Sequence, residues 1–282
     1  MKQVELASGR RLPALGQGTW NMGEDAAMRQ REIESLQLGF DLGLTVVDTA
    51  EMYADGGAEE VVGAAIAGRR EQVFVVSKFY PHHADLRGMR AACERSLKRL
   101  GSDRIDLYLL HWRGAVPLAE TLDGLVRLQR EGKIVEYGVS NFDLDDMRET
   151  AGLAGGARVA LNQVLYNLAQ RGPEWDLLPW CRAHGIPLMA YSPLESGGAE
   201  RARLLATPEL QQVARRHGAT PAQVALAWLL RDDGVMAIPK AADAGHVRAN
   251  RAALDMVLTK DDLAELDRGF PAPQRRRPLA MR

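Results

Sequence analysis

Short strand-like runs alternate with helix-like segments along nearly the whole of this 282-residue chain. Counting from GQGTW, there are eight such runs, and most of them are rich in Val, Ile or Leu. Runs of this length and composition are typical of strands that are buried on both faces, as in parallel sheets. Repeated βα units of this kind predict a single α/β barrel of the (β/α)8 TIM type.

Local signals predict further elements around this barrel. The opening VELASGRRLPAL predicts a β-hairpin with Ser8-Gly9 at its turn. Near the C-terminus, Thr207-Pro208 and Thr220-Pro221 each open an extra helix, with Thr as N-cap and Pro at the first helical position. Helical periodicity predicts other helices over 25–42, 58–67, 85–100, 117–130, 143–152, 173–184, 241–254 and 259–270.

No Pro- or Ser-rich linker and no break in composition divides the chain. We therefore expect one domain over residues 1–282, in which residues 274–282 form a flexible tail, as chain ends often do. A doubly wound dinucleotide-binding fold is the rival architecture, and it needs G-x-G-x-x-G after its first strand. Gly16 and Gly18 are followed by Thr19, Trp20 and Asn21, so the third glycine is missing and this fold is rejected.

The composition excludes several classes of protein. The formal net charge of -1 gives no excess that would favour nucleic acid or a membrane surface. Cys93 and Cys181 lack metal-ligand spacing, which indicates reduced thiols in a reducing compartment. No signal-peptide pattern opens the sequence, and the apolar runs are far shorter than the roughly 20 residues that span a bilayer. We expect a cytoplasmic protein that is a monomer.

Polar residues stand at the downstream ends of three neighbouring apolar runs. Asp48 ends TVVD, Lys78 ends VFVVSK and His111 follows IDLYLL, while Tyr53 lies in the loop after Asp48. Because the carboxyl ends of parallel strands meet at one rim of a barrel, we expect these four side chains to converge there.

Together, these four side chains could transfer a proton to a substrate. A free tyrosine has a pKa of about 10, and a nearby ammonium such as that of Lys78 lowers it. Asp48 would hold Lys78 charged, and His111 could orient a substrate oxygen by a hydrogen bond. The set can protonate an oxygen but cannot reduce a carbon, so a hydride donor is required, and a nicotinamide cofactor is the natural choice.

Other interpretations stay open at this point. Taken singly, each residue could be a solvated loop residue or a structural hydrogen-bonder. A barrel isomerase or lyase could use Tyr53 and Lys78 without hydride transfer. A metal site is disfavoured because His82-His83 lies in a polar loop without helical i, i+4 spacing, so no metal is expected. The side chains that such a site would draw on are Asp48, Glu51, His82, His83 and His111.

Several longer motifs resemble those of the aldo-keto reductase family, and they occur in the family's order along nearly the whole chain. GLTVVDTAEMY, VSKFY and LYLLHW resemble the segments that carry the catalytic residues. GKIVEYGVSNF, LNQVLYN, AYSPL and AIPKA resemble the segments that contact the cofactor. Small bacterial reductases of methylglyoxal type are the most similar subgroup. The resemblance implies an α/β barrel that reduces small aldehydes and 2-oxoaldehydes without metal or flavin. It implies NADPH as the hydride donor, with NADH as the alternative.

The resemblance also assigns roles to individual positions. Asp48, Tyr53, Lys78 and His111 match the catalytic tetrad, in which Tyr53 would be the general acid. Trp20, Phe79 and Trp112 would line an apolar substrate pocket around the carbonyl. The positions that match cofactor contacts are Thr19, Trp20, Ser140, Asn141, Gln163, Tyr191, Ser192, Leu194, Lys240, His246 and Asn250.

The chain departs from the family pattern in places that bear on selectivity. His246 stands where an arginine usually faces the 2′-phosphate, and Ala241 stands where a serine usually follows the lysine. Both changes weaken the expectation of a strict NADPH preference. The loop after Tyr53 is three residues longer than the common form, and the short C-terminal tail would leave the pocket open on one side. A regulatory NADPH-binding subunit with slow turnover is the alternative function, and the intact tetrad argues against it.

Overall fold

The computed structural model describes residues 1–282, and its centre is a ring of eight parallel strands. The strands pair in sequence order, and parallel bridges from Leu15 to Ala237 and from Gly18 to Lys240 join the first strand to the last. The predicted barrel is thereby confirmed. Its strands are β3 (Gln17–Gly18), β4 (Val46–Asp48), β5 (Phe74–Phe79), β6 (Ile105–Leu110), β7 (Ile134–Ser140), β8 (Asn162–Leu165), β9 (Leu188–Tyr191) and β10 (Val235–Ala237).

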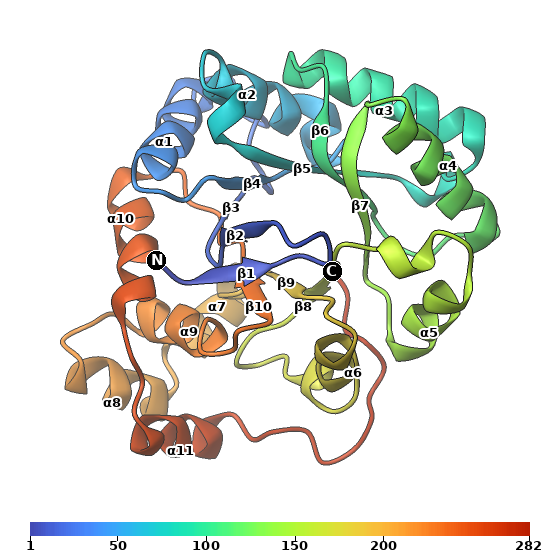
Figure 1. The fold of residues 1–282 in the computed structure, drawn as a ribbon. Coiled ribbons are helices and arrows are strands. Elements are labelled where there is room, and N and C mark those ends of the chain that lie inside the picture. The colour runs from blue at the N-terminus through green and yellow to red at the C-terminus, as the bar shows by residue number, and fades with distance from the viewer.

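Helices form an outer layer around the ring (Figure 1). Every residue of β5 and of β6 is buried, as expected for strands with the barrel interior on one face and helices on the other. The helices are α1 (Arg29–Asp41), α2 (Gly57–Ile66), α3 (Leu86–Leu100), α4 (Leu118–Arg130), α5 (Leu144–Gly152), α6 (Leu177–Ala183), α7 (Gly198–Leu205), α8 (Pro208–Arg216), α9 (Pro221–Leu229), α10 (Ala244–Ala252) and α11 (Lys260–Gly269).

The largest differences from the sequence-based prediction concern three helices. α1 begins at Arg29 rather than near residue 25, because the Asp25 carboxylate accepts a hydrogen bond from the Ala27 amide at 2.8 Å and holds a turn there. α6 begins at Leu177, because residues 172–174 form a separate 3-10 turn. α7 was not predicted: two glycines precede it, and Leu204 is its one buried side chain, so it has little apolar periodicity.

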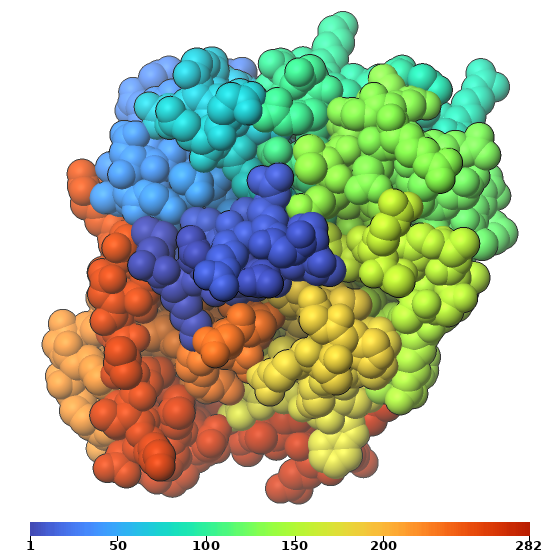
Figure 2. Space-filling view, in the orientation of Figure 1, coloured from blue at the N-terminus to red at the C-terminus, as the bar shows by residue number.

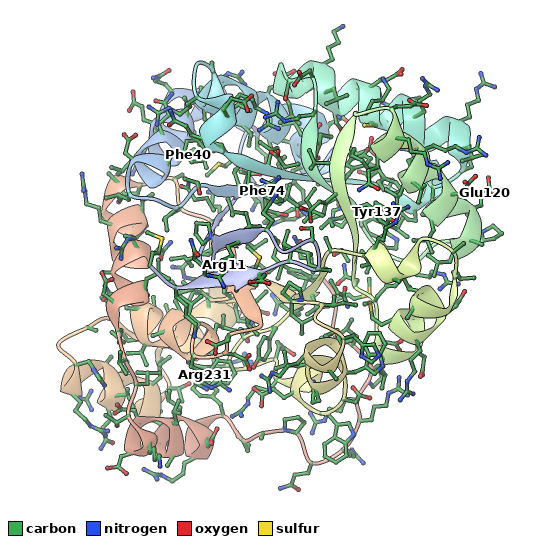
Figure 3. The ribbon with its side chains drawn as sticks, in the orientation of Figure 1. Arg11, Phe40, Phe74, Glu120, Tyr137 and Arg231 are labelled. Atoms are coloured by element: carbon green, nitrogen blue, oxygen red, sulfur yellow. The ribbon has the colours of Figure 1, made fainter.

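The predicted N-terminal hairpin is confirmed, and it covers one end of the barrel. It consists of β1 (Gln3–Glu5) and β2 (Arg11–Pro13), with Gly9 at φ 83° in the turn. Figures 1 and 2 show the hairpin lying across the barrel at the front of the molecule. Phe74, at the start of β5, lies beside the hairpin (Figure 3). The guanidinium of Arg10 lies 5.6 Å from the centre of the Phe74 ring. The N-terminal ends of the strands are thus closed off, which leaves the C-terminal ends for a site.

None of the helices is both long and apolar enough to cross a membrane.

Candidate active site

A cavity of about 670 Å³ lies at the C-terminal ends of the barrel strands. Its lining draws on the ends of β3, β4, β7, β8 and β9 and on the segments that follow β6 and β10. Most of the side chains predicted from sequence therefore meet in one place, as the strand-end argument requires. The predicted residues that line this cavity are Thr19, Trp20, Asp48, Tyr53, His111, Trp112, Ser140, Asn141, Gln163, Tyr191, Ser192, Leu194 and Lys240.

Lys78 lies beneath the cavity floor and connects Asp48 to Tyr53. Its ammonium donates hydrogen bonds to Asp48 Oδ2 at 2.8 Å, to the Thr49 carbonyl at 2.8 Å and to the Tyr53 hydroxyl at 3.1 Å. The Lys78 side chain is completely buried, so these three acceptors replace the water that an ammonium would otherwise bind. Lys78 has no route to solvent and can act only through its neighbours.

Charge in this cluster is balanced. Burial raises the pKa of Asp48 and lowers the pKa of Lys78, and the attraction between the two opposite charges opposes both shifts. Burial also raises the pKa of Tyr53 well above its usual value of 10.0, and the negative Asp48 adds to that shift. The lowered tyrosine pKa expected from Lys78 is therefore not found, because Asp48 offsets the ammonium and burial disfavours the phenolate. Tyr53 stays a protonated phenol at neutral pH.

His111 lies beside Tyr53 and is uncharged. The two ring centroids are 5.9 Å apart at an interplanar angle of 72°. Burial lowers the pKa of His111 to about 2, and the positive Lys78 contributes to that shift. A neutral imidazole has one N–H donor and one acceptor nitrogen, so His111 can donate one hydrogen bond to an oxygen in the cavity without carrying charge.

A second polar network lies on the other side of the cavity. The Tyr191 hydroxyl donates to Asn141 Oδ1 at 2.9 Å, and Asn141 Nδ2 donates to the His111 carbonyl at 3.1 Å. Gln163 Nε2 donates to Asp48 Oδ1 at 2.7 Å. These bonds connect the predicted cofactor side to the predicted catalytic side, so the two halves of the site are held in a fixed geometry.

The sequence profile of the Aldo/keto reductase family matches residues 14–269, which is most of the chain and includes every residue of the barrel. The chain belongs to the aldo/keto reductase family.

Related proteins extend this match over the full length of the reductase. Methylglyoxal reductase YeaE of Escherichia coli (strain K12) is 50% identical over 280 residues, which cover 99% of each chain. Glyoxal reductase of Bacillus subtilis (strain 168) is 33% identical over 94% of this chain and 91% of its own. A crystal structure of an aldo/keto reductase from Klebsiella pneumoniae in complex with NADP and acetate is 54% identical, with a TM-score of 0.97 and 99% of each chain covered.

Besides Lys78, three predicted site residues of this reductase lie outside the cavity lining. Phe79 is fully buried and packs on Tyr108, with 4.9 Å between the ring centroids. Its assignment to the substrate pocket is corrected: side chains alternate along a strand, so Phe79 faces away from the interior that Lys78 faces. His246 and Asn250 lie on α10, where His246 is exposed and Asn250 is buried.

Eleven lining residues were not identified from the sequence, and five of them have long, flexible side chains. Arg201 lies on α7, a helix that was not predicted, and it makes no ion pair with a carboxylate. The helix-forming run AERARLL after Gly198 was the signal that could have located it. No local pattern in the sequence marked the others. The five are Met52, Glu195, Arg201, Met281 and Arg282.

The loop that carries Tyr53 has an unusual backbone. Ala54 and Asp55 both have φ 51°, and Gly56 has φ 92°. Two consecutive non-glycine residues in the left-handed region store strain, which is found mainly at functional sites. This turn directs the chain from Tyr53 straight into α2.

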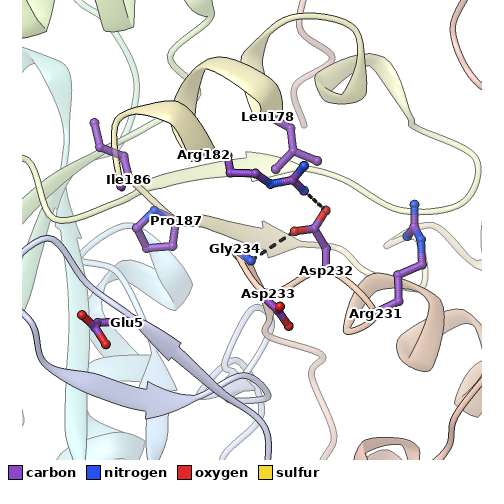
Figure 4. A pocket seen from close by; sticks show the side chains of 10 residues that line it. Glu5, Leu178, Arg182, Ile186, Pro187, Arg231, Asp232, Asp233 and Gly234 are labelled. Atoms are coloured by element: carbon purple, nitrogen blue, oxygen red, sulfur yellow. Dashed lines mark hydrogen bonds and ion pairs between the residues drawn. The ribbon is translucent and has the colours of Figure 1, made fainter.

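A second cavity, of about 620 Å³, lies at the opposite end of the barrel beside Glu5 of the hairpin (Figure 4). Arg182 points toward Asp232 and forms an ion pair with it, while Asp232 Oδ1 accepts a hydrogen bond from the Gly234 amide at 3.1 Å (Figure 4). Its other charged groups are ion-paired with residues outside the cavity lining, Glu5 with Arg11, Arg231 with Glu174 and Asp233 with Lys2. The cavity contains no tyrosine or histidine. The cavity at the C-terminal ends of the strands is therefore the candidate active site.

Proposed function

We propose that this reductase uses NADPH to reduce small aldehydes and 2-oxoaldehydes such as methylglyoxal to alcohols, with Tyr53 as the general acid. The observation that carries the proposal is the Tyr53 hydroxyl, which lines the cavity while bonding at 3.1 Å to an ammonium buried behind it. The proposal draws on the relatives too, because two are named for methylglyoxal and glyoxal reduction and one was crystallised with NADP.

The cationic and hydrogen-bonding side chains that line the cavity are suited to binding nicotinamide adenine dinucleotide phosphate. Arg201 and Lys240 line the cavity and neither is paired with a carboxylate, so both are free to bind phosphate oxygens. The half-buried Tyr191 ring offers a flat face against which a nicotinamide could stack, and Ser140, Asn141 and Gln163 would hold its carboxamide. When bound, NADPH supplies the hydride that reduces the carbonyl carbon.

Residues of the chain would donate the proton to the substrate oxygen and stabilise the phenolate that remains. The substrate oxygen would sit between the Tyr53 hydroxyl and the neutral His111, whose N–H fixes its position. Tyr53 gives its proton to that oxygen, and the phenolate that remains accepts the hydrogen bond from Lys78 at the 3.1 Å contact. Asp48 holds Lys78 in place at 2.8 Å. Lys78 would thus stabilise charge that develops during the reaction rather than acidify the resting phenol.

The cavity favours a small substrate. A space of about 670 Å³ that must also hold a dinucleotide leaves little volume for the carbonyl compound. The walls near Tyr53 are aromatic, and the Trp20 ring meets the Tyr53 ring edge-on at 5.0 Å between centroids. Trp112 and Met52 add further apolar surface. Few groups are available to recognise a large polar substrate, which supports broad selectivity for small carbonyls.

Initial rates of NADPH oxidation with a panel of carbonyl compounds test this proposal. Methylglyoxal, glyoxal and short aldehydes should be reduced with higher kcat/KM than aldose sugars or steroid ketones. NADH should be accepted less well, because Lys240 and Arg201 have no 2′-phosphate to bind. Tight NADPH binding with no turnover on any small carbonyl would contradict the proposal and would favour the regulatory alternative.

A further inference from the structure

The segment 271–282 is attached to the catalytic end of the barrel. From α11 it runs past α6 and back toward the barrel axis (Figure 1). Arg276 pairs with Asp145 at 2.7 Å, with Asp176 at 3.1 Å and with Asp143 at 3.5 Å. Asp143 and Asp176 are the N-cap residues of α5 and α6, so Arg276 connects the segment to two helix ends at that side. Leu279 packs against the hydrophobic core.

Beyond this anchor, the segment reaches the active-site cavity. Met281 and Arg282 both line it. The Arg282 guanidinium lies 2.6 Å from Glu195 Oε2 and donates a hydrogen bond to Ser196 Oγ at 3.0 Å. Arg282 thus binds two successive residues of the loop after β9, whose members Ser192 to Ser196 all line the cavity.

Arg282 is the one cation that is paired with the buried carboxylate of Glu195. The Glu195 side chain is 2% exposed, and its one other polar contact is a long hydrogen bond of 3.4 Å from Gln170 Nε2. A buried carboxylate without a cation is strongly unfavourable. Glu195 also has φ 62°, and Ser192 has φ 46°, so the loop conformation is strained at two non-glycine residues. The contact with Arg282 therefore stabilises the loop in this shape, together with the hydrogen bonds that the Ser192 carbonyl accepts from Asn167 Nδ2 at 2.9 Å and from the Glu195 amide at 3.0 Å.

Other cations in the cavity are free for a different task. Arg201 and Lys240 carry unpaired charge, whereas the charge of Arg282 is neutralised by Glu195. Arg282 is consequently better suited to hold the loop than to bind a phosphate directly.

We propose that Arg282 is a positioning residue: through Glu195 it holds the loop 192–197 against the bound cofactor and slows the release of that cofactor. This inference rests on the proposed NADPH-dependent function. It adds to that function an ion pair between Glu195 and Arg282, two residues that lie 87 positions apart in the chain. This contact closes one side of the cavity.

The test is the NADPH dissociation rate, measured by stopped-flow fluorescence on the full-length protein. Arg282→Gln and Glu195→Gln should each speed release by about tenfold, the factor expected for one charged contact. The double variant should release NADPH no faster than either single variant, because both remove the same contact. Arg282→Lys should recover part of the loss. Arg277→Gln is the matched control, since Arg277 is an exposed arginine of the same segment without an ion pair, and it should behave as wild type.

The outcomes separate this inference from the proposed function. If wild-type protein fails to bind NADPH, both are overturned. If wild type binds and turns over but the variants release NADPH at the wild-type rate, the inference alone is wrong. Additive effects in the double variant, or an equal effect of Arg277→Gln, would likewise overturn the pairing. A lowered melting temperature with unchanged NADPH release would show a structural role alone.

Discussion

Tyr53→Phe should lower the rate of carbonyl reduction by roughly 10²–10⁴-fold, the range expected for loss of a general acid. NADPH affinity should hardly change, because the phenyl ring can keep the edge-on contact with Trp20 and only the hydroxyl is lost. The hydroxyl accepts one hydrogen bond from Lys78, which retains two other acceptors in Asp48 and the Thr49 carbonyl. Turnover should be measured beside an NADPH fluorescence titration on the same preparation.

Tyr80→Phe is the matched control for this variant. Tyr80 follows Phe79 in the chain, packs near Trp112 with 5.9 Å between centroids, and does not line the cavity. Its loss of a hydroxyl should leave turnover close to wild type. A Tyr53→Phe variant that keeps a tenth of wild-type activity would show that another group donates the proton.

Lys78→Met should also lower kcat by orders of magnitude, and the loss should persist at saturating substrate. The reason is that Lys78 contacts the phenol oxygen and not the cavity, so it acts on the charge that develops in the transition state. The same change leaves Asp48 buried and without its cation, which should reduce the free energy of unfolding by about 3–5 kcal/mol. Kinetic constants and denaturant unfolding curves should be measured together.

A paired variant separates these two effects of Lys78→Met. Asp48→Asn combined with Lys78→Met removes both charges, so it should recover much of the lost stability. Activity should stay low, because no ammonium faces the Tyr53 hydroxyl. Recovery of turnover in the double variant, or a Lys78→Met variant altered in KM alone, would contradict the role assigned to Lys78.

Much of the barrel and of the site's composition could be predicted because the signals are local. Asp48, Lys78 and His111 each stand at the end of an apolar run, and parallel strands bring such ends together wherever the helices lie. The orientation of the Phe79 side chain was also predictable from the sequence, since side chains alternate along a strand and Phe79 directly follows Lys78. The family resemblance places Phe79 in the pocket, whereas the alternation of side chains along β5 places it on the opposite face of the strand from Lys78.

Other features depend on contacts between segments that are distant in the chain, so no local pattern in the sequence indicates them. The pKa of Tyr53 is raised because folding buries the phenol and places the negative charge of Asp48 near it. The sequence indicated an ammonium near the phenol but not the burial that outweighs it. The ion pair between Glu195 and Arg282 is equally invisible in the sequence, where Arg282 is one of several arginines in a basic tail expected to be flexible.

Transfer of deuterium from labelled cofactor tests the central claim most directly. Wild-type protein is incubated with methylglyoxal and NADPH that carries deuterium at the transferable position of its nicotinamide C4, and the product is analysed by mass spectrometry and NMR. The account predicts deuterium on the new carbinol carbon, one atom for each cofactor oxidised, and almost none with Tyr53→Phe. Oxidation of NADPH that leaves the product without deuterium, or conversion of methylglyoxal that needs no NADPH, would contradict it.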